Sequence, residues 1–342
     1  MGKGTDIERA AGAIMGALIG DALGLGCHWY YDMGAFRKDC GDRVEDYMDS
    51  NPDRKDRFGP IARFRHDAGL RAGDVSQTGQ VTILLLESLA ERGCYDEGDF
   101  LSRMDGLLAS LDGTPFSGRY TDWAMREVWK NRHGGIAWEK AGSQADTAEA
   151  AMRSALLAAR LYRDPEALAK EGHRNICLTH GDPYVASQSL AFALTVAAFI
   201  DGSPLEEAGR YMGRLAENDV IRRRIPSFDI LNQVGNGAVA VRSGVDIDPP
   251  SRVCSLHGLS CTLGFMLPSA YYLIHRFPED FEGAVLSAVN GGGNNMARAA
   301  LTGALSGALV GLAGIPERFI SGLTDHDRLL ESARAVARDA RK

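Results

Sequence analysis

The chain has 342 residues, 45% of them hydrophobic, and carries a formal net charge of -7 at pH 7. This length is enough to bury a large core. The acidic balance excludes a nucleic-acid-binding surface, which needs clustered Lys and Arg, and the three arginines at 222–224 are expected to lie in solvent. The six cysteines have no Cys-x-x-Cys spacing, which indicates reduced thiols, a cytoplasmic location and no zinc framework.

Helical hydrophobic patterns recur along the whole chain, whereas alternating strands rich in Val, Ile and Thr are nearly absent. The first predicted helix covers residues 10–23, and the second covers 77–92 and stops at Gly93. The third covers 99–111, with Asp99 as its N-cap. The other predicted helices cover 121–131, 145–162, 165–171, 183–200, 204–217, 227–243, 260–276, 278–289, 296–312, 316–322 and 325–341. The sequence therefore predicts an all-α fold in a single compact domain, 1–342.

Two connections in this pattern are long, residues 26–74 and 244–255. The first spans nearly fifty residues and contains Trp29, Tyr30 and Tyr31. A connection of this length is unusual in a compact domain unless it has a function. We expect it to cover a cleft, where the aromatic rings stack on a base or sugar or simply pack in the core.

Two glycine-rich segments, 12–24 and 303–311, place glycines four residues apart on one helix face. A face without side chains lets another backbone approach closely, so we expect these helices to pack tightly. The second segment belongs to a run of 17 uncharged residues, 299–315, which is short for a membrane span and rich in small residues. The sequence therefore predicts buried core helices and no membrane partner.

Four polar clusters lie at predicted helix ends: residues 20–21 with 27–32, residues 74–80, residues 179–183 and residues 290–295. Helix N-termini offer free N–H groups and the positive end of the helix dipole, which suit a phosphate. A phosphorylated small molecule is the expected ligand. Simpler interpretations stay open, because Asp182 before Pro183 is also an ordinary N-cap and His180 could be a core histidine. The three consecutive glycines at 291–293 could form only a tight loop.

These motifs resemble the ADP-ribosylglycohydrolase family over roughly residues 10–315. The resemblance lies in Gly-Ala-Leu-Ile-Gly-Asp-Ala-Leu-Gly at 16–24, Thr-His-Gly-Asp-Pro at 179–183 and the glycine-rich segment 292–311. Within the family the chain looks most like the branch of jellyfish J1 crystallins and selenoprotein J, through residues 27–32 and 290–295. The resemblance implies an orthogonal, all-helical domain of the ADP-ribosylglycohydrolase type that binds an ADP-ribose-like ligand.

The resemblance also implies two magnesium ions, held by a Thr-Asp-Asp-Thr and an Asp-Thr-Asp-Thr segment. Alignment places residues 76–79 on the first segment and 294–297 on the second, and neither contains an aspartate. Two dications require anionic oxygen ligands at close range, whereas these segments offer neutral oxygens at best. We therefore predict no metal ligand and no cofactor.

The carboxylates and the histidine nearest the matched motifs are the candidate catalytic residues, because glycosidic hydrolysis needs an acid or base near the anomeric carbon. They are Asp21, Asp32, Asp182 and His180. The candidate ligand-binding residues are Cys27, His28, Trp29, Ser76, Gln77, Thr78, Gln80, Gly292, Gly293, Asn294, Asn295 and Arg298.

Two hypotheses follow for the function of the chain. One is a divergent hydrolase of an ADP-ribosyl or related N- or O-glycosidic bond that lacks the usual dinuclear magnesium site. The other is a catalytically inactive member that binds a nucleotide or serves as a crystallin-like structural protein. The two hypotheses differ in whether the four candidate catalytic residues converge on one cleft. The sequence leaves the substrate and the oligomeric state open.

Overall fold

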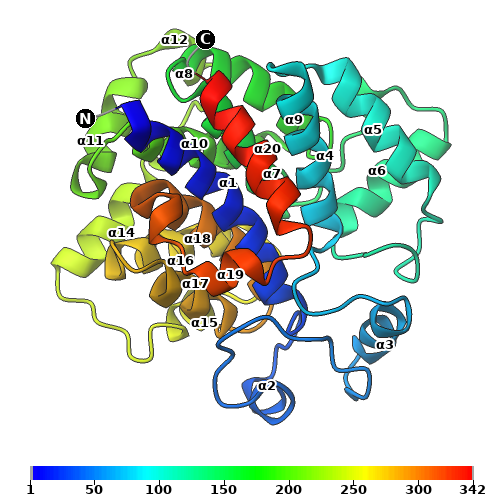
Figure 1. Cartoon of the computed structure of the whole chain (residues 1–342). Helices are drawn as coiled ribbons and strands as arrows, with labels where there is room; N and C mark the ends of the chain where they lie inside the picture. The colour runs from blue at the N-terminus through cyan, green and yellow to red at the C-terminus, as the bar shows by residue number, and fades with distance from the viewer. Residues whose placement is uncertain (1–2, 341–342) are drawn as a thin grey trace.

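The computed structural model of the chain describes residues 3–340, and helices dominate it throughout (Figure 1). Within these residues no β-strand forms, and β pairing is limited to isolated bridges such as Tyr30 with Gly293. The helices are α1 Lys3–Leu25, α2 Met33–Cys40, α3 Gly59–Asp67, α4 Gln77–Arg92, α5 Glu97–Ala109, α6 Trp123–His133, α7 Glu149–Leu161, α8 Pro165–Ala167, α9 His173–Cys177, α10 Pro183–Ile200, α11 Ala208–Leu215, α12 Asp219–Arg222, α13 Phe228–Leu231, α14 Gln233–Arg242, α15 Arg252–His257, α16 Leu263–Arg276, α17 Phe281–Val289, α18 Asn295–Val310, α19 Glu317–Ser321 and α20 His326–Asp339. The predicted all-α class is confirmed.

The core is built around the antiparallel contact of α1 with α18, the most extensive helix pair in the protein. A Cβ atom added to Gly16 would lie 2.1 Å from the carbonyl oxygen of Gly303, and one added to Gly303 would lie 2.1 Å from that of Gly16. A real side chain cannot occupy that space, so the two backbones touch directly. The close packing predicted from the glycine spacing is confirmed. Figure 1 shows α1, in blue, running through the middle of the molecule beside α20.

Helix α10 is the only described helix that is long and apolar enough to cross a membrane. Its apolar stretch is 89% buried inside the protein, as expected for a central core helix. Asp182 caps the start of α10 by accepting hydrogen bonds from the N–H groups of Tyr184 and Val185, and Pro183 follows as its first residue. The N-cap expected from the sequence is therefore present.

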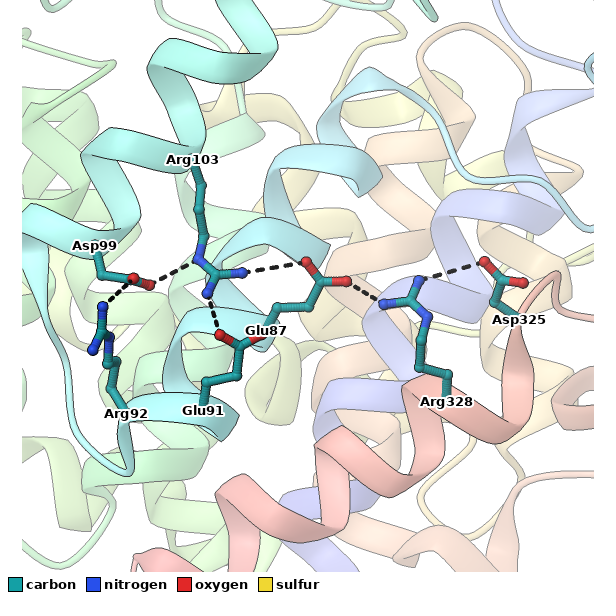
Figure 2. Close-up of polar contacts among 7 residues, drawn as sticks. All are labelled: Glu87, Glu91, Arg92, Asp99, Arg103, Asp325 and Arg328. Carbon is teal, nitrogen blue, oxygen red and sulfur yellow. Dashed lines mark hydrogen bonds and ion pairs between the residues drawn. The ribbon is translucent and has the colours of Figure 1, made fainter.

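The surface between α4, α5 and α20 carries a chain of ion pairs (Figure 2). Arg103 contacts Glu91 at 2.5 Å, Asp99 at 2.7 Å and Glu87 at 3.5 Å, and Glu87 also pairs with Arg328 of α20. Hydrogen bonds from Arg103, and then from Arg92, hold the pKa of Asp99 well below its usual range. Asp99, in the first turn of α5, therefore forms ion pairs with Arg92 and Arg103.

The prediction that Asp99 is the N-cap of the third helix is wrong. Helix α5 begins at Glu97, and the carboxylate of Asp96 accepts the hydrogen bond from the N–H of Asp99. Several other boundaries shift by a few residues, and the predicted helix 227–243 divides into α13 and α14. The last predicted helix, 325–341, corresponds to α20, and its final residue lies outside the described residues.

The long connections are more ordered than the sequence indicated. Segment 26–74 contains α2 and α3, which Figure 1 shows at one end of the molecule, next to the C-terminal end of α1. Segment 244–255 includes the start of α15. Helix α2 begins after Asp32, whose carboxylate accepts a hydrogen bond from the N–H of Ala35, and α3 has a proline in its first turn.

Candidate ligand site at the ends of three helices

The C-terminal half of α1 is tied to the start of α4 by Asp21. Its carboxylate, only 1% exposed, accepts hydrogen bonds from the backbone N–H of Ser76 at 2.7 Å and from the Ser76 hydroxyl at 2.6 Å. A Cβ atom on Gly79 would lie 2.6 Å from this carboxylate, so a glycine is needed there. Burial raises the pKa of Asp21 to about 6, against the opposing effect of the Ser76 hydrogen bonds. Asp21 therefore changes protonation close to neutral pH.

The start of α18 is tied to the end of α1 by Asn295 and His28. The Asn295 amide donates to the carbonyls of Cys27 at 3.2 Å and Val289 at 3.1 Å, so its Oδ1 must be the atom that faces His28 Nδ1 at 3.2 Å. Because Oδ1 only accepts, Nδ1 of His28 carries the proton. Burial, and then the charge of Arg65, lowers the pKa of His28 well below its ordinary value. The neutral ring therefore presents a bare Nε2 lone pair, and this buried atom has no hydrogen-bond partner among the described residues.

A two-way backbone contact fixes the loop before α18 against the residues that follow α1. The N–H of Trp29 donates to the carbonyl of Gly293 at 2.9 Å, and the N–H of Gly293 donates to the carbonyl of Tyr30 at 2.6 Å. Gly292 and Gly293 have φ values of 68° and 63°, and a Cβ on Gly293 would lie 2.3 Å from the carbonyl oxygen of Leu259. Trp29 itself has a φ of 66°, which is strained for a large side chain. The glycines of this loop are thus required for both backbone conformation and space.

The connection between α1 and α4 folds over these helix ends. The Trp29 ring, 8% exposed, stacks on Phe58 with 4.8 Å between the ring centres and lies 6.0 Å from Tyr120. The guanidinium of Arg65, from α3, lies 4.9 Å from the centre of the Trp29 ring. We call residues 26–74, which contain Trp29, Phe58 and Arg65, the cover segment.

Two buried arginines of the cover segment differ in how their charges are matched. Arg54 donates to the carbonyls of His28 at 2.8 Å and Trp29 at 3.1 Å, and it also forms an ion pair with Asp56. Arg65, 3% exposed, donates through Nη2 to the carbonyl of Tyr120, while its Nε has no partner among the described residues. Burial lowers the pKa of Arg65 to about 10, and Asp21 is the carboxylate that opposes this shift. Arg65 therefore remains a buried cation without a dedicated counter-ion.

The predicted ligand residue Arg298 is fully buried and holds the loop before its own helix. It donates to the carbonyls of Gly292 at 3.0 Å and Gly258 at 3.3 Å. Its neighbour Asn294 has no hydrogen-bond partner for Oδ1 within residues 3–340. Arg298 thus stabilises the glycine loop, and both its Nε and the Oδ1 of Asn294 are buried without a hydrogen-bond partner among the described residues.

A second buried polar cluster lies beyond Thr78, around a cavity of about 10 Å³, roughly the size of one water molecule. The Thr78 hydroxyl donates to Asp122 at 3.4 Å, and His180 lies 3.4 Å from Glu149. Burial raises the pKa of Asp122 to about 7, with a further contribution from the negative charge of Glu149, and burial also raises the pKa of Glu149 to about 7. A hydrogen bond from Thr147 opposes the rise in the pKa of Glu149 but does not outweigh burial.

His180 belongs to this second cluster. Its ring nitrogens lie 2.9 Å from the hydroxyls of Thr147 and Thr179, and burial lowers its pKa to about 4. The histidine is therefore neutral at physiological pH. This arrangement matches the core histidine interpretation that the sequence left open, although the ring also faces two carboxyl groups.

The structure brings together some of the predicted site residues and separates others. The three helix ends hold two sets of contacts. Asp21 contacts Ser76, and Asn295 contacts both His28 and Cys27. Asp32 and Asp182 do not join them, because each caps a helix, and Asp32 is exposed. Gln77 lines a small cavity with Tyr120, and Gln80 lines a separate surface cavity beside α20. The four candidate catalytic residues therefore do not converge on one cleft.

Five charged residues that the sequence did not single out are buried: Arg54, Arg65, Asp122, Glu149 and Arg153. Asp122 directly precedes α6 and could have been recognised as an N-cap, since its carboxylate accepts a hydrogen bond from the N–H of Met125 at 2.6 Å. Arg65 and Glu149 carry no such local signal, because only tertiary packing places them inside the protein.

The residues present do not fit a dinuclear magnesium site. Ser76 is hydrogen-bonded to Asp21, and Asn295 is hydrogen-bonded to His28. Met296 and Ala297 are buried apolar side chains. Across residues 3–340, no group of three or more His, Cys, Asp or Glu side chains is arranged to hold a metal ion. Magnesium requires hard, anionic oxygen ligands, which neither aligned segment supplies.

A cavity of about 490 Å³ lies outside the buried site at the three helix ends. It opens between α2, residues 249–255 and α17, and reaches Asn290 and Gly291 at the start of the glycine loop. Its rim carries side chains of both charges, among them Arg37, Arg252 and Asp42. The cavity size alone does not define the site, and the chemistry of the three helix ends is more specific.

These observations define an all-helical protein with a buried polar site where α1, α4 and α18 end or begin, beneath a cover segment. The family model described as ADP-ribosylglycohydrolase matches residues 3–342, and the chain belongs to the ADP-ribosylglycohydrolase family. It is 25% identical over 332 residues to an uncharacterized protein of Archaeoglobus fulgidus, covering 95% of each chain. A solved structure titled ADP-ribosylglycohydrolase-related protein complex matches with a TM-score of 0.64 and 21% identity, covering 98% of this chain and 99% of the other, which shows a shared fold.

Proposed function

We propose that the protein binds an ADP-ribose-like phosphorylated small molecule at the ends of α1, α4 and α18, and hydrolyses an ADP-ribosyl or related glycosidic bond without a dinuclear magnesium site. The observation that carries this proposal is a set of buried polar atoms that have no hydrogen-bond partner within residues 3–340: His28 Nε2, Arg65 Nε, Asn294 Oδ1 and Arg298 Nε. Buried polar groups in folded proteins are nearly always hydrogen-bonded, so such a set indicates a ligand or water. Membership of the family supports ADP-ribose chemistry at this place.

The atoms of this set match different parts of a nucleotide sugar. The bare Nε2 of His28 can accept a hydrogen bond from a sugar hydroxyl, and the guanidinium of Arg65 can pair with a phosphate. Trp29 offers an aromatic face, although Phe58 and Arg65 already lie against its ring. A ligand would therefore enter by displacement of the cover segment.

Asp21 is the carboxyl group best placed for proton transfer at this site. Its pKa of about 6 means that it is partly protonated near neutral pH, as an acid or base in glycosidic hydrolysis requires. Its hydrogen bonds to Ser76 fix its orientation. In the proposed reaction Asp21 exchanges a proton with the attacking water or with the leaving group.

The inactive alternative has a specific observation in its favour. Asp32 and Asp182 serve as helix caps, so Asp21 has no second carboxylate from the predicted set beside it. The resemblance to the J1-crystallin branch favours the same alternative, which would be a nucleotide-binding or structural protein. In both proposals the partner is a small molecule, not a nucleic acid or a membrane.

A hydrolysis assay separates the two proposals. ADP-ribosyl-arginine and an ADP-ribosyl-serine peptide are incubated with the protein in EDTA, and released ADP-ribose is measured by chromatography. We expect release by the wild type, and a loss of about 100-fold or more in Asp21→Asn. Asp182→Asn is the matched control, because asparagine retains helix capping and the residue lies outside the site. Binding without release of ADP-ribose would favour the inactive alternative, and activity only with magnesium would contradict the metal-free mechanism.

A further inference from the structure

We propose that the place where the family alignment puts the metal-ligand segments has become an anion site in this chain, with Arg65 as its cation and a phosphate or pyrophosphate group as its ligand. The inference rests on the proposed function for the identity of the whole ligand, but simple anions test it independently. Two aspects of the structure support it: the unmatched charge of Arg65 and the uncapped start of the long helix α18.

The first aspect is the environment of Arg65. This side chain is 3% exposed, donates through Nη2 to the carbonyl of Tyr120 and leaves Nε without a partner among the described residues. Burying a cation is costly unless an anion pairs with it. Asp21 is close enough to influence the charge of Arg65, but its carboxylate already accepts two hydrogen bonds from Ser76. The guanidinium therefore has unused capacity for an incoming anion.

The second aspect is the start of α18, which is uncapped, whereas the start of α4 is capped by Ser76. Each helix has 16 residues, and neither has an acidic residue in its first turn. Asp21 compensates the start of α4 through Ser76, whereas Asn294 makes no capping hydrogen bond at the start of α18. Unpaired N–H groups and the positive end of the helix dipole both favour an anion at this position.

The remaining charges near the site do not cancel this positive potential. Arg54, the other buried guanidinium of the cover segment, is paired with Asp56 and donates to the carbonyls of His28 and Trp29. The charges of Arg65 and Arg54 both lower the pKa of His28. Arg298 is a further buried guanidinium, and within residues 3–340 it donates to the carbonyls of Gly292 and Gly258 but pairs with no carboxylate. Asp21 is thus opposed by the guanidinium groups of Arg65 and Arg298 and by the start of α18, and the balance favours an additional anion over a cation.

The hydrogen-bonding pattern narrows the kind of anion. Guanidinium and backbone N–H groups are donors that fit the oxygens of a phosphate. The Nε2 of His28 is an acceptor, so it matches a hydroxyl on the same ligand. A phosphate or pyrophosphate esterified to a sugar has both features. Free pyrophosphate supplies the anionic part alone and is therefore the probe.

Calorimetric titration with pyrophosphate in EDTA tests the inference. We expect binding by the wild type and at least tenfold weaker binding by Arg65→Gln. Arg57→Gln is the matched control, because Arg57 also lies on the cover segment, is exposed and stacks on Phe58 at 4.7 Å. Arg65→Lys keeps the positive charge but removes the planar guanidinium, so the affinity of this variant for pyrophosphate should lie between those of the wild type and Arg65→Gln. Circular dichroism of each variant checks that the fold is intact.

The outcomes separate this inference from the proposed function. No binding of pyrophosphate by the wild type, equal binding by folded Arg65→Gln, or an equal loss in Arg57→Gln would overturn the anion site. Magnesium alone binding more tightly than pyrophosphate would overturn it as well. Pyrophosphate binding that depends on Arg65, without cleavage of ADP-ribosyl bonds, would support the anion site and refute the hydrolase. Binding of ADP-ribose but not of free phosphate or pyrophosphate would refute an independent anion site only.

Discussion

Replacing Glu149 with glutamine should stabilise the protein at alkaline pH. Glu149 is 4% exposed, and a hydrogen bond from Thr147 opposes the effect of burial on its pKa only in part. Burial raises its pKa from the ordinary 4.5 to about 7. Because the folded pKa lies above the unfolded one, the folded state binds the proton more tightly. The contribution of Glu149 to stability is therefore fully present below pH 4.5 and is lost as the pH rises through about 7.

The size of this effect follows from the pKa shift. The rise from 4.5 to about 7, at 1.36 kcal/mol for each pKa unit, corresponds to about 3 kcal/mol of lost stability at pH 8. Glutamine has nearly the same volume and no charge, so Glu149→Gln removes this cost. The pKa of Asp122 should fall in the same variant, because the charge of Glu149 contributes to its rise.

Urea unfolding at pH 5 and pH 8 measures the prediction directly. We expect Glu149→Gln to exceed the wild type by about 1–3 kcal/mol at pH 8 and by less than about 1 kcal/mol at pH 5. Glu139→Gln provides the matched control, because Glu139 is exposed and should show no such pH dependence. An equal change in stability at both pH values, or a loss at pH 8, would refute the reasoning about the buried carboxyl pair.

Three further predictions address the core, the site and a helix cap. Gly303→Ala should destabilise the protein by about 2 kcal/mol or more, because the new Cβ would lie 2.1 Å from the carbonyl oxygen of Gly16. Gly106→Ala is the control, because Gly106 has open space around it and the change should be neutral or slightly stabilising. Urea unfolding measures both variants, and a neutral effect of Gly303→Ala would contradict the prediction. ¹⁵N NMR should find His28 neutral, with the proton on Nδ1 at pH 6, and a protonated Nε2 would contradict the orientation assigned through Asn295. Asp182→Ala should cost about 1 kcal/mol in thermal unfolding and leave ADP-ribose affinity unchanged, and weakened ligand binding would show a role beyond capping.

The helical class and the central pair α1 and α18 could be predicted because they depend on local patterns. Periodic apolar residues define a helix, and glycines spaced four apart predict a face without side chains. The helices missed in segment 26–74 are short and polar, so their patterns are weak. Asp32 before α2 and the proline at the start of α3 were the available signals. The incorrect N-cap at Asp99 shows that neighbouring acidic residues compete for the same role.

The candidate site was predictable only in part. Polar residues next to helix ends marked Asp21, His28, Ser76 and Asn295 as candidates. The sequence did not predict that Asp21 contacts Ser76 or that His28 contacts Asn295, because the partners are far apart along the chain. Burial of Arg65 and Glu149 could not be predicted, because charged residues are usually exposed and only tertiary packing places these two inside.

The measurement that tests the central claim most directly is calorimetric titration of ADP-ribose, once with excess magnesium and once with EDTA. The absence of carboxylates from both aligned segments predicts equal affinity in the two titrations. Affinity that appears only with magnesium would contradict the metal-free site and restore the metal-dependent chemistry of the family, and no binding in either titration would contradict an ADP-ribose site altogether.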